Sequence, residues 1–241
     1  MNHPDVLSTA REPQAPQAGA QFLPPALLAA SLLAGTALSL LVLPGWLTGL
    51  ARSLQGEQPT VFWLLSRASA LVSFGLLWLS MALGLLITGK TARLWPGSAT
   101  TFDLHEHTSL LGLIFGLLHA LLLLGDQYIH FDAVQIVLPF ASLGYRPLAV
   151  GLGQLALYAW AMVHVSFYLR RQMGQPAWRA LHAVSFAVFV LALFHGVTAG
   201  TDAGALGGIY WLAGGSLLFL LVYRLLVMLF PAPRKEPRRT A

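Results

Sequence analysis

Six long apolar stretches alternate with short polar breaks along the 241 residues of this chain. They cover residues 22–43, 61–87, 104–124, 148–169, 178–199 and 207–230, to within a few positions. Each supplies the roughly 20 apolar residues that an α-helix needs to cross a bilayer. Turn-forming residues punctuate the pattern at Pro44-Gly45, Trp95-Pro96-Gly97, Gly174-Gln175-Pro176 and Pro231. The pattern predicts an all-α polytopic membrane protein folded as a six-transmembrane-helix bundle.

The segments outside these stretches are short or polar. Residues 1–21 are rich in Pro, Gln and Ala without apolar periodicity, so we expect a disordered cytosolic N-terminus there. Residues 231–241 carry four basic side chains and predict a basic cytosolic tail. Residues 126–145 form the only long loop between spans, and their mixed polarity predicts an interfacial stretch over the outer end of the bundle. Residues 22–230 are therefore expected to form one membrane domain.

Composition supports the membrane class and narrows the chemistry. Only 10% of residues are charged and the mean hydropathy is +0.69, whereas a soluble domain carries about a quarter charged residues. The pI near 10 would suit nucleic acid, but the basic residues flank apolar stretches, so the expected partner is the lipid bilayer. Cys is absent, which excludes disulfides, thiolate-held iron–sulfur clusters and covalent heme attachment through Cys-x-x-Cys-His.

The distribution of Lys and Arg predicts the orientation of the spans. Only Arg52 and Arg146 lie in loops on one side. Ten basic residues lie on the other: Arg11, Lys90, Arg93, Arg170, Arg171, Arg179, Arg234, Lys235, Arg238 and Arg239. Because cytoplasmic loops are enriched in positive charge, both termini are expected to be cytoplasmic, in a multi-pass protein of the cell's inner membrane.

Four histidines lie inside two of the predicted spans at matching positions. His105 and His119 are fourteen positions apart in the third span, and His182 and His195 are thirteen apart in the fifth. Each separation is roughly 20 Å along a helix, about two-thirds of a hydrocarbon core. The predicted orientation places His105 and His182 near the cytoplasmic face and the other two near the outer face. Such paired depths suit two stacked hemes, each between two imidazoles, although a membrane His also serves in plain interhelical hydrogen bonds.

On a helical wheel, the angle between the two histidines differs between the third and the fifth span. On an ideal helix His119 lies about 40° from His105, and Gly112 and Gly116 fall between them on the same face. These glycines either leave room for a flat macrocycle or form a Gly-x-x-x-Gly packing contact. In the fifth span, thirteen residues place His195 about 140° from the first histidine. Either that helix is irregular or the two hemes approach it from different sides.

Other polar residues in or beside the spans suggest secondary roles. Arg67 is a charge within the second span, and it needs a heme propionate, a carboxylate or the interface as partner. Tyr145-Arg146 at the outer mouth either bind an outer propionate or anchor the chain at the interface. His164 lies at the inner depth, where it either binds a propionate or replaces a ligand. His107 faces away from its neighbouring histidine, which favours a helix-end hydrogen bond.

The spacing His105-x13-His119 and His182-x12-His195, with Arg67 early in the second span and Trp178-x3-His182 opening the fifth, resembles the ferric reductase-like transmembrane domain. Ferric reductases, NADPH oxidases and the heme-binding subunit of the bacterial methionine-sulfoxide reductase system share this domain. The resemblance covers about residues 60–225. It implies two hemes b, an inner one held by His105 and His182 and an outer one held by His119 and His195.

One feature of that family is not found in this sequence. Ferric reductases and NADPH oxidases carry a flavin and nicotinamide domain after the last span, but no Gly-x-Gly-x-x-Gly follows a strand here. We therefore expect any flavin to belong to a separate partner.

The interpretation is a di-heme b protein that carries single electrons across the membrane, from a cytosolic flavoprotein or a quinol to an outer acceptor, as a component of an oxidoreductase. Two imidazoles per iron leave no open coordination site, which favours electron transfer. The alternatives are a heme-free transporter or proton-relay protein that uses the intramembrane His residues and Arg67, and an assembly subunit without electron flow.

Overall fold

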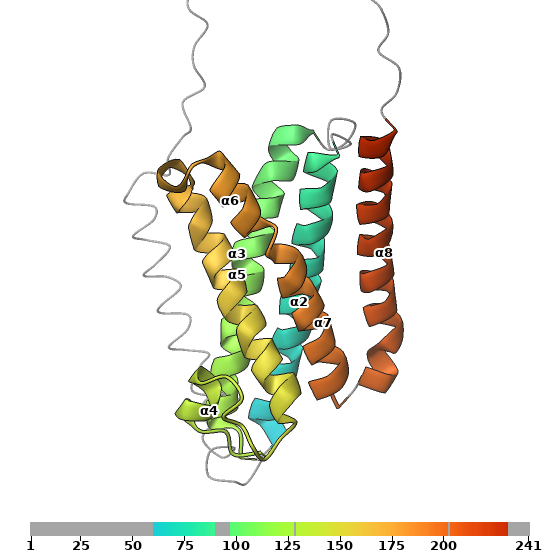
Figure 1. Ribbon diagram of the computed structural model, residues 1–241. Helices are drawn as coiled ribbons and strands as arrows, with labels where there is room; N and C mark the ends of the chain where they lie inside the picture. Colours follow the sequence, from blue (N-terminus) through green and yellow to red (C-terminus); the bar gives the residue numbers. More distant parts are fainter. Residues whose placement is uncertain (1–59, 90–96, 128, 202, 231–241) are drawn as a thin grey trace, which may run out of the picture. The chain divides into compact units, whose positions relative to one another are not determined.

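The computed structural model describes residues 60–89, 97–127, 129–201 and 203–230, all within one compact unit (Figure 1). These residues contain helices and no strand, so the all-α prediction is confirmed for the described part of the chain. The predicted first span, 22–43, and the two predicted tails lie outside it. The helices are α2 (Thr60–Thr88), α3 (Ser98–Leu122), a 3-10 turn η2 (Leu123–Gly125), α4 (Ala133–Val137), α5 (Pro147–Met173), α6 (Gln175–His182), α7 (Ser185–Ala199) and α8 (Ala203–Leu229).

Five segments of the described chain are long and apolar enough to cross a membrane. They are 61–88, 98–125, 147–173, 175–199 and 203–229, and they correspond to the predicted second to sixth spans. Large apolar side chains on their outer faces are exposed, including Trp211 at 83% and Phe219 at 69%. Contiguous exposed apolar surface is unusual on a soluble protein and is compatible with a lipid bilayer around these helices.

The predicted fifth span is not one continuous helix. α6 ends at His182 and α7 begins at Ser185. Between them, Val184 N–H donates to the Leu181 carbonyl at 3.0 Å and Phe186 N–H to the Ala183 carbonyl at 3.2 Å. These are bonds over three residues, typical of a 3-10 turn, which rotates the chain about 120° per residue instead of 100°. Of the two alternatives for this span, the irregular helix is confirmed.

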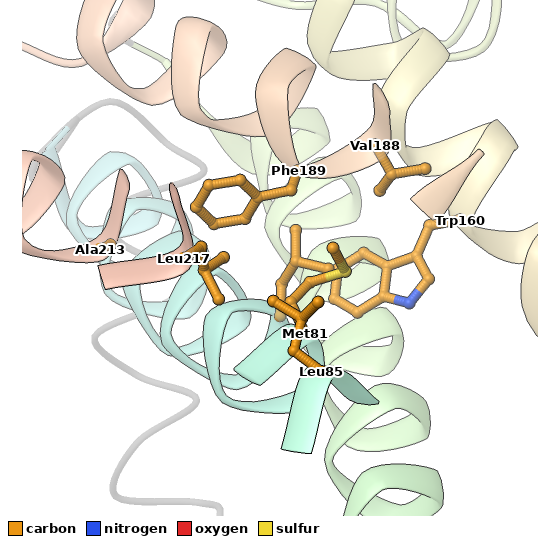
Figure 2. Close-up of a cluster of buried hydrophobic side chains, with 8 residues drawn as sticks. Met81, Leu85, Trp160, Val188, Phe189, Ala213 and Leu217 are labelled. Carbon is orange, nitrogen blue, oxygen red and sulfur yellow. The ribbon is translucent and has the colours of Figure 1, made fainter. Parts of the chain in front are cut away.

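The buried core lies in the middle of the described helices and joins four of them (Figure 2). Trp160 of α5 packs there with Val188 and Phe189 of α7. α2 contributes Leu77, Met81 and Leu85, and α8 contributes Ala213 and Leu217. α5 also runs along α6 and α7, because Gly174, with φ at 80°, reverses the chain directly after α5.

The predicted interfacial loop, 126–145, is partly helical and is tied to α5. α4 begins with a capping box, in which Gln135 N–H donates to the Asp132 carboxylate at 2.7 Å. The Gln154 amide of α5 donates to the carbonyls of Gln135 and Ile136 at 2.7 and 2.8 Å. The Tyr158 hydroxyl of α5 donates to the Val137 carbonyl. The loop is therefore fixed against the bundle through its backbone.

Candidate functional site

The structure brings the four histidines of the predicted third and fifth spans together as two pairs. The rings of His105 on α3 and His182 at the end of α6 have centroids 6.1 Å apart. The rings of His119 on α3 and His195 on α7 have centroids 6.0 Å apart. Both pairs have an angle of 67° between the ring planes. Two sites of the same local geometry thus lie at two levels of the bundle, fourteen residues apart along α3.

Hydrogen bonds to backbone carbonyls orient three of the four imidazoles. The Nδ1 atoms of His105, His119 and His195 lie 2.8, 2.9 and 2.8 Å from the carbonyl oxygens of Ser80, Ser66 and Ala149. A carbonyl only accepts, so each Nδ1 carries the proton and donates it. In a neutral imidazole the other nitrogen, Nε2, then keeps its lone pair. This is the tautomer that a histidine adopts when it binds a metal through Nε2.

The fourth imidazole differs from the others. His182 Nδ1 is buried without a hydrogen-bond partner in the part of the chain that the structure describes, and so is the indole Nε1 of Trp178. The two rings lie one helical turn apart, with centroids 5.2 Å from each other and planes tilted by 34°. The Trp178-x3-His182 spacing noted in the sequence therefore produces a ring contact at the inner pair.

A row of buried serines on α2, which the sequence analysis did not identify, lines the contact with α3. The hydroxyls of Ser66, Ser73 and Ser80 donate to the carbonyls of His119, Gly112 and His105 at 2.9, 2.8 and 3.3 Å. The serines are seven residues apart, and so are the carbonyls that they reach, in reverse order along an antiparallel helix. A seven-residue repeat keeps one face of α2 against one face of α3. The signal in the sequence was this repeat of serines within an apolar span.

Glycines lie beside the histidines and in the contacts between the helices. A Cβ atom on Gly153 of α5 would lie 2.5 Å from His195 Nδ1, and one on Gly84 of α2 would lie 3.3 Å from His105 Cε1. At Gly112 a Cβ would lie 2.7 Å from the Trp160 ring, and at Gly116 it would lie 3.1 Å from Ser73 Oγ. Gly112 therefore packs against Trp160, whereas Gly116 lines the same cavity as His119 and His195, and Gly153 leaves room for the His195 ring.

The outer histidine pair lies on an apolar cavity of about 210 Å³. Arg67 of α2 lines the same cavity as His119 and His195, so the charge in the second span lies at the outer pair. Residues of the 126–145 loop, including Phe131 and Ile136, contribute to its wall. Most of its surface is aliphatic or aromatic, with a few polar groups among them, as is typical of ligand-binding cavities.

The other polar residues singled out in the sequence have local partners. The Tyr145 hydroxyl donates to the Ala199 carbonyl at 2.7 Å, and the Arg146 guanidinium donates to the Thr198 carbonyl, so both bind the C-terminal end of α7. His107 Nδ1 donates to the Asp103 carbonyl at 2.7 Å, which confirms its predicted helix-end hydrogen bond. His164 contacts Tyr168, with ring centroids 5.9 Å apart.

No family model, curated protein or solved structure matches this chain. Membership of the ferric reductase-like family therefore stays a prediction from the residues quoted above.

The separation within each pair fits one metal ion between two imidazoles. A metal–imidazole bond is about 2.0–2.1 Å and a ring nitrogen lies about 1.1 Å from the ring centre, so two imidazoles on opposite sides of one ion have centres about 6.3 Å apart. The observed 6.1 and 6.0 Å are close to this value. Among the described residues, no cluster of three or more His, Cys, Asp or Glu could hold a bare metal ion. Each pair supplies two imidazoles as possible ligands, His105 with His182 and His119 with His195.

Proposed function

We propose that this chain binds two b-type hemes, one between His105 and His182 and one between His119 and His195, and passes single electrons across a membrane. The observation that carries the proposal is the repeated pair of imidazoles, 6.1 and 6.0 Å between centroids, at two levels of one bundle. When bound, heme supplies the one-electron chemistry. The chain supplies axial ligands, their orientation and an apolar environment.

The choice of ligands favours electron transfer over binding of a small molecule at the metal. His105 with His182 and His119 with His195 would hold the two hemes, and a heme iron held by two imidazoles would supply one-electron chemistry. Along α3, the fourteen residues from His105 to His119 correspond to about 21 Å. Two sites at this spacing divide the apolar core into shorter steps, so an electron need not cross the whole layer at once.

The outer cavity offers a second polar group that fits a heme. Arg67 lines the cavity beside His119 and His195. The two propionates of a heme are carboxylates, and a guanidinium is the side chain best suited to bind a carboxylate in a site of low polarity. We assign Arg67 to a propionate of the outer heme.

The electron donor is proposed to be a separate protein or a quinol. The last turn of α5 carries Arg170 and Arg171, and α6 carries Arg179, on the side that charge counting assigns to the cytoplasm. The Arg170 guanidinium stacks on the Phe167 ring at 3.8 Å and donates to the Phe167 carbonyl at 2.6 Å. Arg171 and Arg179 are exposed, so they are the better candidates for docking an acidic flavoprotein. The acceptor would be reached at the outer pair.

The hydrogen bonds at the outer pair leave one acceptor nitrogen on each ring. His119 and His195 both donate Nδ1–H to backbone carbonyls, so Nε2 of each neutral ring keeps its lone pair. Two such nitrogens would bind either a metal ion or a shared proton, so the heme content of the purified protein separates the proposal from a heme-free proton relay.

The deciding experiment is the spectrum and heme content of the purified full-length protein from heme-replete cells. About two hemes b per chain with a low-spin bis-imidazole spectrum are expected. Replacing His105 or His182 by Ala should remove one spectral component, and replacing His119 or His195 should remove the other. His107→Ala is the matched control, because this histidine bonds the Asp103 carbonyl of its own helix and belongs to neither pair, and it should keep both components. A colourless preparation would end the proposal.

A further inference from the structure

We propose that Ser66 and Ser80 are positioning residues that each hold one heme ligand and set the reduction equilibrium of one heme separately from the other. The proposal rests on the proposed function, because it assigns roles toward the hemes that the two histidine pairs would bind. It goes beyond ligation, since neither serine touches the metal.

The same arrangement of atoms occurs at both levels of the bundle. Ser66 Oγ lies 2.8 Å from His119 Nδ1, and Ser80 Oγ lies 3.1 Å from His105 Nδ1. In each case the hydroxyl donates its own proton to the backbone carbonyl of that histidine, at 2.9 and 3.3 Å. Each serine also offers its own carbonyl to the same Nδ1. A single serine thus presents two oxygen acceptors to the Nδ1–H of one histidine.

The direction of these bonds follows from the chemistry of the groups. The serine proton is used in the bond to the histidine carbonyl, so the hydroxyl oxygen faces Nδ1 with a lone pair. Both serines are buried, so water does not compete for these contacts. An imidazole that donates strongly through Nδ1 is more basic at Nε2 and better stabilises the more highly charged, oxidised metal.

Each pair contains one serine-held imidazole and one that is held differently. His195 donates to the Ala149 carbonyl alone. His182 Nδ1 has no partner within the described ranges. The serines therefore bond the α3 histidine of each pair. Through them, α2 contacts His119 at the outer pair and His105 at the inner pair.

The chain provides its own control for this role. Ser73 lies midway between the two positioning serines, is buried, and donates to the Gly112 carbonyl at 2.8 Å. It makes the same contact between α2 and α3, but the residue that it meets has no side chain. Ser73 lines the outer cavity as Ser66 does, but its hydroxyl bonds no imidazole, so Ser73→Ala removes an equivalent bond without removing an acceptor from a histidine Nδ1.

The test is a redox titration of the purified di-heme protein, followed in the visible spectrum and by electron paramagnetic resonance of the oxidised hemes. Ser66→Ala should raise the equilibrium constant for reduction of the outer heme by roughly twofold to tenfold, the effect of one hydrogen bond. Ser80→Ala should do the same for the inner heme alone. Ser73→Ala should move neither, and Ser66→Thr and Ser80→Thr, which keep the hydroxyl, should restore the wild-type values.

The possible outcomes separate this inference from the proposed function. A wild-type protein without heme overturns both. Two hemes that titrate unchanged in the Ser66→Ala and Ser80→Ala proteins overturn the inference alone, and so does an equal shift in Ser73→Ala. Loss of the outer heme in Ser66→Ala supports the inference when Ser66→Thr and Ser73→Ala keep both hemes. The same loss in Ser66→Thr would assign the serine a role in packing and contradict the proposal.

Discussion

Gly153→Ala is predicted to remove the outer heme and leave the inner one. The added Cβ would lie 2.5 Å from His195 Nδ1 and 2.7 Å from its Cγ, whereas non-bonded carbon contacts are favourable at about 3.5–4.0 Å. The ring therefore has to move by about 1 Å. A ring displaced that far cannot keep both its 2.8 Å bond to the Ala149 carbonyl and its 6.0 Å separation from His119.

The size of the effect follows from the contacts that are lost. Mutation of groups that orient a metal-binding histidine typically weakens metal affinity about 10- to 100-fold. Heme content should then fall from about two to about one per chain, with only the outer spectral component missing. The assay is extraction of the hemes from detergent-purified protein at known chain concentration, together with the visible spectrum before extraction.

Two glycine variants serve as controls for that experiment. Gly75→Ala in α2 has no atom within 4 Å of its new Cβ, and alanine favours a helix over glycine, so it should keep both hemes. Gly214→Ala in α8 brings its new Cβ to 3.5 Å from Leu193, an ordinary contact that involves no histidine. It should also keep both. If Gly153→Ala bound two hemes with an unchanged spectrum, the geometric argument for the outer pair would be wrong.

Three further changes test other parts of the structure. Trp160→Ala empties the space beside Gly112 and removes the bond to the Ser109 hydroxyl. The free energy of unfolding, measured by thermal unfolding, should therefore fall by about 3–5 kcal/mol, and an unchanged unfolding curve would contradict the assigned core. Arg67→Gln should reduce outer heme content and spare the inner heme by the same extraction assay, and equal loss of both would refute its assignment. Arg171→Glu should slow reduction by a soluble flavin reductase in a salt-dependent way without changing the oxidised spectrum; a rate that matches wild type at low salt would remove this residue from the docking site.

Much of the described fold could be predicted, because the length of each apolar stretch and the turn residues that bound it indicate helices long enough to cross a membrane. The predicted spans from 61–87 to 207–230 correspond to helices that extend a few residues further at most ends. The four histidines could be paired because their spacing in sequence converts to depth. The break at Ala183 and Val184 gave only an indirect signal, the 140° mismatch between His182 and His195, since both residues are ordinary members of an apolar helix.

The supporting residues could not be predicted in the same way. A single serine in an apolar span does not indicate a particular role from the sequence. Its role depends on which atom of a neighbouring helix its hydroxyl faces. Ser66, Ser80 and the Ala149 carbonyl acquire their roles only from the rotation of α2 and α5 against the helices that carry the histidines. The sequence gives no signal for Gly153 either, because the histidine ring that it leaves room for, that of His195, lies 42 residues later in the chain.

The division of each site between two helical hairpins has a consequence for biogenesis. One half of each site comes from α2 and α3, which hold each other through Ser66, Ser73 and Ser80. The other half comes from α5 to α7, which are synthesised later. During insertion the first hairpin can form with its imidazoles already oriented, and it has to wait for the second to supply the opposing ligands. In the proposed function, cofactor capture is thus a late step, because both ligands of a pair are present only after α5 to α7 have packed against α2 through the buried core.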